Sequence, residues 1–233
     1  MESKWSGVGQ DAFFNIEHFD RNRIMKQPEY EISGRITKGA YYIISVDVGR
    51  KGCDTVATVL RVTPQSAGFS IKTLVNIYTL TDTHFEDQAI FLKRLYFRYK
   101  AQRMVIDANG IGIGLVDYMI KGQVDDGGTD FPPFGVYNDD DGYYKKYRTN
   151  NTEMDALYLI KASLPINSEA HVNLQVHLQT GRIKFLIDER VAKAKLLSLK
   201  RGQEMTAEER AEYLKPYTLT SILKEEMNLT SLL

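Results

Sequence analysis

The sequence has 233 residues, of which 43% are hydrophobic and 26% charged, which is typical of a soluble globular protein with a full core. The 30 Lys and Arg residues balance the 30 Asp and Glu residues, so any nucleic-acid binding must come from a local patch. The single cysteine, Cys53, excludes an internal disulfide and a cysteine-rich zinc site, and no apolar run approaches the roughly 18 residues of a membrane span. We therefore expect a soluble intracellular protein.

Residues 1–40 show no sustained hydrophobic periodicity, although they contain several aromatic side chains. We expect this stretch to be a linker or lead-in segment that packs on a domain. The domain itself is predicted to span 41–233.

The first strong pattern is the apolar run that begins at Tyr41, ends in Asp47 and turns on Gly49. A short run rich in β-branched and aromatic residues predicts a buried central strand. Two further β-branched segments, at 54–62 and 69–80, follow after short turns. These three strands are predicted to form an antiparallel meander.

A helix is predicted after the sequence Thr83-His-Phe-Glu86, which has the spacing of a capping box. The apolar residues of this helix recur at intervals of three and four, so they form one stripe that would cover a face of the sheet. They are Phe85, Ala89, Leu92, Tyr96 and Tyr99.

The run from Arg103 to Asp107 repeats the first design, because an apolar strand again ends in an aspartate and meets a glycine turn at Gly110. A helix at 115–121 and a strand at 134–137 are predicted next. The order of strand, crossover helix and strand implies parallel pairing.

The C-terminal part is predicted to be mainly helical. We expect helices near Thr152–Ala162 and Ser168–Gln179, with Gly181 ending the second as a C′ residue, because glycine readily adopts the left-handed conformation there. A strand at 182–187 and charged helices at 188–200, 206–214 and beyond Thr220 complete the chain.

Three antiparallel strands, a helix and then parallel strands with helices form the order of the ribonuclease H-like fold, an α/β fold with a mixed sheet. In that order the first strand lies beside the fourth, so Asp47 and Asp107 would end side by side, on strands about 4.8 Å apart. Carboxylates at that distance repel each other unless they share a cation, and a hard divalent ion is the natural partner. Such acidic sites hold two metal ions that hydrolyse a phosphodiester bond.

At this point the sequence resembles the nuclease domain of the large terminase subunits of tailed bacteriophages. The resemblance lies in the order of its motifs over most of the chain. These are Trp5-Ser-Gly7, Ala12-Phe-Phe14, the strand from Tyr42 through Asp47 to Gly49 with Asp54 after it, and the run from Val105 through Asp107 to Gly114.

The resemblance implies a metal-dependent endonuclease that cuts concatemeric double-stranded DNA in the host cytoplasm during genome packaging. It implies Asp47 and Asp107 as catalytic and metal-binding residues, with Mg²⁺ or Mn²⁺ as cofactor, normally as two ions. The implied partners are DNA, the terminase ATPase domain, the portal protein and the terminase small subunit. The phosphate-binding loop of the ATPase motor is absent from this sequence, which therefore resembles the nuclease half alone.

The family's third acidic ligand lies on a helix near the C-terminus, and no residue before Leu233 matches it well. Asp188 has the position of a helix N-cap, and Glu225 and Glu226 lack the family pattern.

Several of these residues also have a structural interpretation. Asp47 could be an ordinary turn residue, and Asp54 could either cap a turn or be an outer-shell ligand. The glycines after Asp107 could hold a phosphate, or they could give the chain room to leave the sheet. The stretch Tyr143–Arg148 could bind DNA, or it could be a solvated face.

Two other functions remain open from the sequence. Asp47-Val-Gly49 and Asp107-Ala-Asn-Gly110 superficially resemble the phosphate loops of actin-like and sugar-kinase ATPases, although the chain is short for both lobes of such a protein. The chain could also be a non-catalytic docking module for the portal or the motor.

Overall fold

The computed structural model describes residues 13–32, 34, 37–49, 52–147 and 154–229. The chain forms two compact units, one made of residues 28–170 and the other of 1–27 together with 171–233. This partition differs from the division at residue 40, which stays a prediction. Asp47 and Asp107 both belong to the 28–170 unit.

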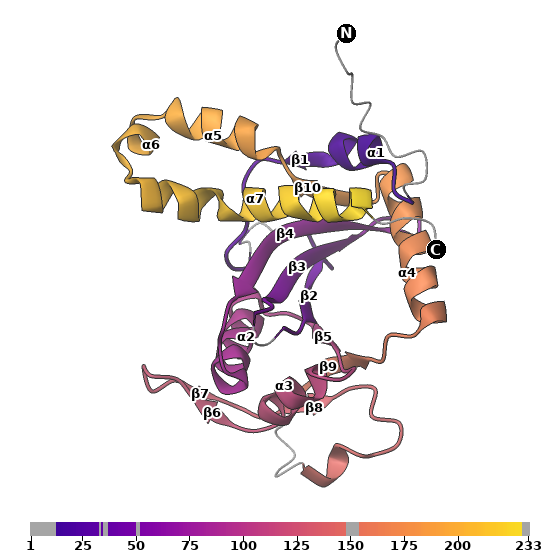
Figure 1. Ribbon diagram of the computed structural model, residues 1–233. Helices are drawn as coiled ribbons and strands as arrows, with labels where there is room; N and C mark the ends of the chain where they lie inside the picture. Colours follow the sequence, from indigo (N-terminus) through magenta and orange to yellow (C-terminus); the bar gives the residue numbers. More distant parts are fainter. Residues whose placement is uncertain (1–12, 33, 35–36, 50–51, 148–153, 230–233) are drawn as a thin grey trace. The chain divides into compact units, whose positions relative to one another are not determined.

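The 28–170 unit is built on a mixed sheet with the strand order β4-β3-β2-β5-β9-β8 (Figure 1). β3 is antiparallel to β2 and β4, whereas β2, β5, β9 and β8 run parallel to one another. The first predicted strand therefore lies beside the fourth, as the ribonuclease H-like order requires. The strands are β2 (Tyr41–Asp47), β3 (Thr55–Pro64), β4 (Ser70–Leu80), β5 (Arg103–Asp107), β8 (Phe134–Val136) and β9 (Met154–Ile160).

One face of this sheet is covered by α2 (Phe85–Tyr99), which follows the meander along the chain. The Tyr99 ring of this helix lies 5.5 Å from the Tyr42 ring of β2. Side chains alternate along a strand, so Tyr42, Ile44 and Val46 are buried on the helix side, and Asp47 belongs to the other face. The apolar stripe of α2 is confirmed, with Ala89, Leu92, Tyr96 and Tyr99 all buried.

The predicted capping box at the start of α2 is wrong. The N-cap residue is His84, which makes no side-chain cap hydrogen bond, and the Thr83 hydroxyl has no hydrogen-bond partner among the described residues. A different side chain bonds to Thr83 at this end of the helix: the side-chain amide of Gln88 donates to the Thr83 carbonyl at 3.0 Å.

The predicted helix at 152–162 is also wrong, because the described part of this stretch forms the strand β9. β9 pairs with β5 on one side and with β8 on the other, and Ala156 and Leu157 are fully buried. Its sequence of Ala, Leu and Met favours a helix in isolation. The two neighbouring strands override that preference, since strand formation depends on packing and pairing more than on local propensity.

The described part of the 28–170 unit also contains four shorter elements. They are α3 (Gly112–Met119), the small antiparallel pair of β6 (Gln123–Val124) and β7 (Asp130–Phe131), and the 3₁₀ turn η1 (Lys145–Tyr147).

The second unit contains a parallel pair of strands and several helices. Its elements are α1 (Ile16–Arg21), β1 (Arg23–Met25), β10 (Ile183–Leu186), α5 (Glu189–Leu197), α6 (Lys200–Glu204) and α7 (Ala207–Leu229), and α4 (Leu164–Gln179) joins the two units. β1 pairs with β10, and Phe19 of α1 stacks on Phe185 of β10 at 4.0 Å.

The predicted N-cap at Asp188 is confirmed, because its carboxylate accepts a hydrogen bond from the backbone N–H of Arg190. Gly181 takes the predicted left-handed conformation after α4, with φ of 66°. Among the described residues, no helix is long and apolar enough to cross a membrane.

Lys93 of α2 is fully buried, and its ammonium donates to the carbonyls of Lys121 and Pro132. Burial lowers the pKa of Lys93 to about 8, because the charged form loses its hydration. In the unfolded chain its pKa is about 10.4, so between pH 8 and 10 the unfolded state binds more protons than the folded state.

We therefore predict that raising the pH from 8 to 10 stabilises the protein by about 2 kcal/mol through this residue. Urea unfolding at several pH values measures the effect. The Lys93→Met variant should lose this dependence, and an equal slope in the variant would contradict the assignment.

Candidate functional site

The two predicted site residues lie at the same edge of the sheet, on neighbouring strands. β2 and β5 pair in parallel, with Val46 opposite Ile106. Asp47 follows Val46 as the last residue of β2, and Asp107 follows Ile106 as the last residue of β5. Neighbouring strands are about 4.8 Å apart, and residues in register point to the same side. The fold therefore places Asp47 and Asp107 at neighbouring strand ends, as predicted.

Asp47 is exposed, and the loop that follows it is held by a buried hydroxyl. Thr55, at the start of β3, accepts a hydrogen bond from Gly49 N at 2.9 Å, and its hydroxyl lies 2.8 Å from Gln88 Oε1. Thr55 and Gln88 are 0% and 1% exposed, so this network lies in the core. Gly49 also lies so close to the backbone of Asp54 that a Cβ would come within 2.3 Å of its carbonyl oxygen. The turn after Asp47 therefore requires glycine.

Asp107 is half-buried, and one of its carboxylate oxygens already has a partner. The backbone N–H of Asn109 donates to Asp107 Oδ1 at 3.0 Å. The Asn109 side chain donates to the carbonyl of Ala162, just beyond β9, at 2.8 Å. The loop after β5 is thus fastened to the loop after β9.

The glycines after Asp107 allow the backbone to pass close to the Asp107 carbonyl and allow α3 to pack closely against α2. A Cβ on Gly112 would lie 1.8 Å from the carbonyl oxygen of Asp107, and a Cβ on Gly114 would lie 2.6 Å from the Phe85 ring of α2. Gly110 has a φ of 54°. These positions confirm that the glycines give the chain room to leave the sheet.

The donor set at this edge fits a hard divalent cation. Both side chains offer carboxylate oxygens, and within the described ranges neither is ion-paired with a Lys or Arg. Mg²⁺ is commonly held by one or two carboxylates, with water and phosphate oxygens filling the other positions. A cluster of three or more His, Cys, Asp or Glu residues able to hold a metal ion is absent from the part of the chain that the structure describes.

The other residues considered in the sequence occupy different places. Asp54 is exposed and directly precedes β3, and Asp188 lies in the second unit, ion-paired with Arg23 at 3.4 Å. Glu225 and Glu226 are on α7, in that same unit. Asp54 lies at the same sheet edge as Asp47, because β3 is antiparallel to β2 and Val56 pairs with Asp47. The other three acidic residues belong to the second unit.

The aromatic and basic stretch after β8 forms a tight turn. The Asp139 carboxylate accepts hydrogen bonds from the backbone N–H groups of Tyr144 and Lys145, both at 3.0 Å. Tyr143 and Tyr147 are exposed, and the Lys146 ammonium lies 3.9 Å and 4.9 Å from their ring centres. Arg148, the last residue of the predicted patch, lies outside the described residues.

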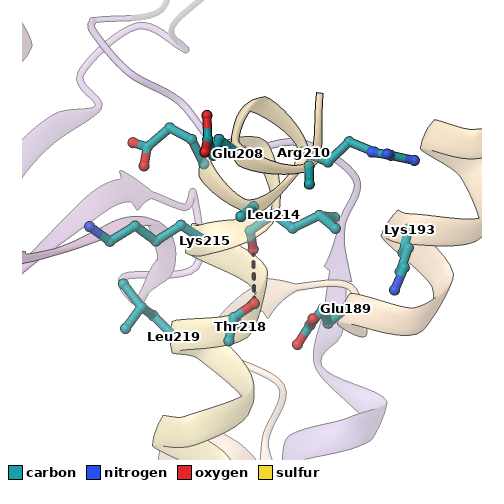
Figure 2. Close-up of a pocket in the computed structure, with 11 residues that line it drawn as sticks. Glu189, Lys193, Glu208, Arg210, Leu214, Lys215, Thr218 and Leu219 are labelled. Carbon is teal, nitrogen blue, oxygen red and sulfur yellow. Dashed lines mark hydrogen bonds between the residues drawn. The ribbon is translucent and has the colours of Figure 1, made fainter. Parts of the chain in front are cut away.

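The groove between α5 and α7, with a volume of about 850 Å³, belongs to the second unit (Figure 2). Side chains of both charges line it around apolar Leu214 and Leu219, with Glu189 and Lys193 on α5 and Glu208 and Arg210 on α7. Neither aspartate of the sheet edge lines this groove.

No known protein family matches the sequence, and no curated protein is detectably similar to it. The structure is similar to that of the magnesium-bound large terminase nuclease from thermophilic phage G20c, with a TM-score of 0.47 and 15% identity over 79% of each chain. The zinc-bound form of that nuclease has a TM-score of 0.44 and 14% identity, over 89% of this chain and 96% of that one. The large terminase nuclease domain of Thermus phage P74-26 has a TM-score of 0.44 and 12% identity, over 78% of this chain and 75% of that one.

We predict that Thr55→Val destabilises the protein by about 2 kcal/mol, because the buried N–H of Gly49 loses its acceptor and Gln88 Oε1 loses the hydroxyl that donates to it. Thr58→Val is the matched control on the same strand, since the Thr58 hydroxyl makes only a 3.5 Å contact with the Ser45 carbonyl. It should change stability by less than about 0.5 kcal/mol. Chemical denaturation of both variants measures the difference, and equal effects would contradict the role of Thr55.

Proposed function

We propose that the 28–170 unit is a divalent-metal-dependent nuclease in which Asp47 and Asp107 hold Mg²⁺ or Mn²⁺. This proposal depends on one observation. β2 and β5 pair in parallel and in register, and the last residue of each strand is an aspartate. Two neighbouring carboxylates that have no ion pair with a described Lys or Arg residue are best stabilised by a shared metal ion.

Metal ions bound there would supply the Lewis-acid activation of water and the stabilisation of the leaving oxygen that phosphodiester hydrolysis needs. Asp47, exposed at the sheet edge, can hold an ion where a phosphodiester backbone can approach it. Asp107 is less exposed and is oriented by the N–H of Asn109, which gives the pair one fixed and one accessible carboxylate.

The motif order in the sequence supports a more specific proposal. The chain would be the nuclease part of a tailed-phage terminase large subunit, and its substrate would be concatemeric double-stranded DNA in the host cytoplasm. Its partners would be the terminase ATPase domain, the portal protein and the terminase small subunit. In that role the number of bound ions would be two.

We predict that Asp47→Asn and Asp107→Asn each abolish metal-dependent cleavage of plasmid DNA. Loss of an outer partner of a metal ligand alone costs about 10-fold to 100-fold, so loss of a ligand should cost more than about 100-fold. Thermal stability without metal should be unchanged or slightly raised, because one of two neighbouring negative charges is removed.

Asp87→Asn is a suitable control, because Asp87 is exposed in the first turn of α2. We expect this substitution to leave cleavage unchanged. If Asp107→Asn unfolds the protein, then Asp107 is a structural residue. Cleavage that survives in both site variants would refute the proposal.

We also predict that Mg²⁺ and Mn²⁺ support cleavage and that Ca²⁺ does not. Mg²⁺ requires near-octahedral geometry at short distances, whereas Ca²⁺ takes more ligands at longer distances. Plasmid nicking assays with each ion after treatment with a chelator measure this, and equal rates in Ca²⁺ would contradict the proposed geometry.

A further inference from the structure

Two hydrogen bonds connect the chain at Asn109 to the end of β9 and the residues just after it, one from the preceding backbone N–H and one from the Asn109 side chain. The backbone N–H of the preceding residue, Ala108, donates to the Ile160 carbonyl at 2.8 Å, which continues the pairing of β5 with β9. The side-chain amide of Asn109 then donates to the Ala162 carbonyl, also at 2.8 Å. Between these two bonds, the N–H of Asn109 points at Asp107 Oδ1.

This arrangement fixes the orientation of the Asp107 carboxylate. With Oδ1 accepting the N–H of Asn109 at 3.0 Å, the other oxygen, Oδ2, remains for a further partner. Groups that orient a metal ligand in this way tune metal affinity without touching the metal. The backbone N–H remains in any substitution other than proline, so a substitution such as Asn109→Ala removes only the side-chain bond to Ala162.

We propose that Asn109 is a positioning residue for the candidate metal site, and this inference rests on the proposed function. Its side chain holds the loop after β5 against the loop after β9, and it thereby keeps the N–H of residue 109 on Asp107 Oδ1. The Asn109 side chain is exposed, so its hydrogen bond contributes little to global stability even though it sets the local geometry.

The first test is Mn²⁺ binding to the Asn109→Ala variant, measured by calorimetry. We expect the affinity to fall about 10-fold, in line with the loss of an outer partner of a metal ligand. The melting temperature in the absence of metal should stay close to that of the wild type.

The second test needs no metal. Amide-proton exchange measured by NMR reports whether the N–H of residue 109 is held, and we expect its protection to fall about fivefold in Asn109→Ala, the value of one ordinary hydrogen bond. This measurement keeps the two proposals distinguishable. If the wild type binds no Mn²⁺, the proposed function fails, and unchanged protection at residue 109 overturns the positioning role.

The chain offers a matched control in Asn138. Its amide donates to the Leu159 carbonyl at 2.8 Å and accepts the Leu159 N–H at 2.9 Å, so it also ties a loop to β9 but does not contact Asp107. Asn138→Ala should lower the melting temperature while keeping the Mn²⁺ affinity and the protection of residue 109. Wild-type Mn²⁺ affinity in Asn109→Ala, or an equal loss of affinity in Asn138→Ala, would overturn the inference.

Discussion

The parallel, in-register pairing of β2 with β5 is the constraint on which the rest of the candidate site depends. It places the last residues of two strands, Asp47 and Asp107, side by side at one edge of the sheet, although they are 60 positions apart in the chain (107 minus 47). Two negative charges on neighbouring strand ends repel each other, and within the described residues no Lys or Arg is ion-paired with either aspartate. A protein that keeps such a pair gains stability when a cation binds.

Each aspartate is followed by a loop that makes hydrogen bonds to another element, and the two loops are held in different ways. The loop after Asp47 is fixed by the buried Thr55 and Gln88, where a missing hydrogen bond is costly. The loop after Asp107 is fixed at the surface, by Asn109 and by a backbone approach that only glycine permits at position 112. Contacts at Gly49, Asn109 and Gly112 thus hold the backbone beside both aspartates, and a held backbone favours binding of small cations with a demanding geometry.

The sequence could predict the two aspartates because each ends a short apolar run and meets a glycine, a local pattern. It could not identify Thr55 and Gln88 as supports of the site, because their partners come from other elements and neither residue belongs to a motif. The only signal was that both are polar at positions facing the core. The stretch at 154–160 was predicted to be a helix from its Ala, Leu and Met content, and the capping box from the spacing of Thr83 and Glu86. Both predictions failed where non-local partners outweighed local preference.

The sequence by itself determined the class of fold and the two apolar strands that end in Asp47 and Asp107, because hydrophobic periodicity and turn residues act over a few neighbouring positions. The neighbouring positions of Asp47 and Asp107 were predicted only through the expected fold, and the tertiary structure decided the actual strand register and that Asn109 reaches the end of β9. These contacts join residues more than 50 positions apart, as the bond from Asn109 to Ala162 does across 53 positions. Their geometry follows from the pairing of whole strands, which no short stretch of the sequence contains.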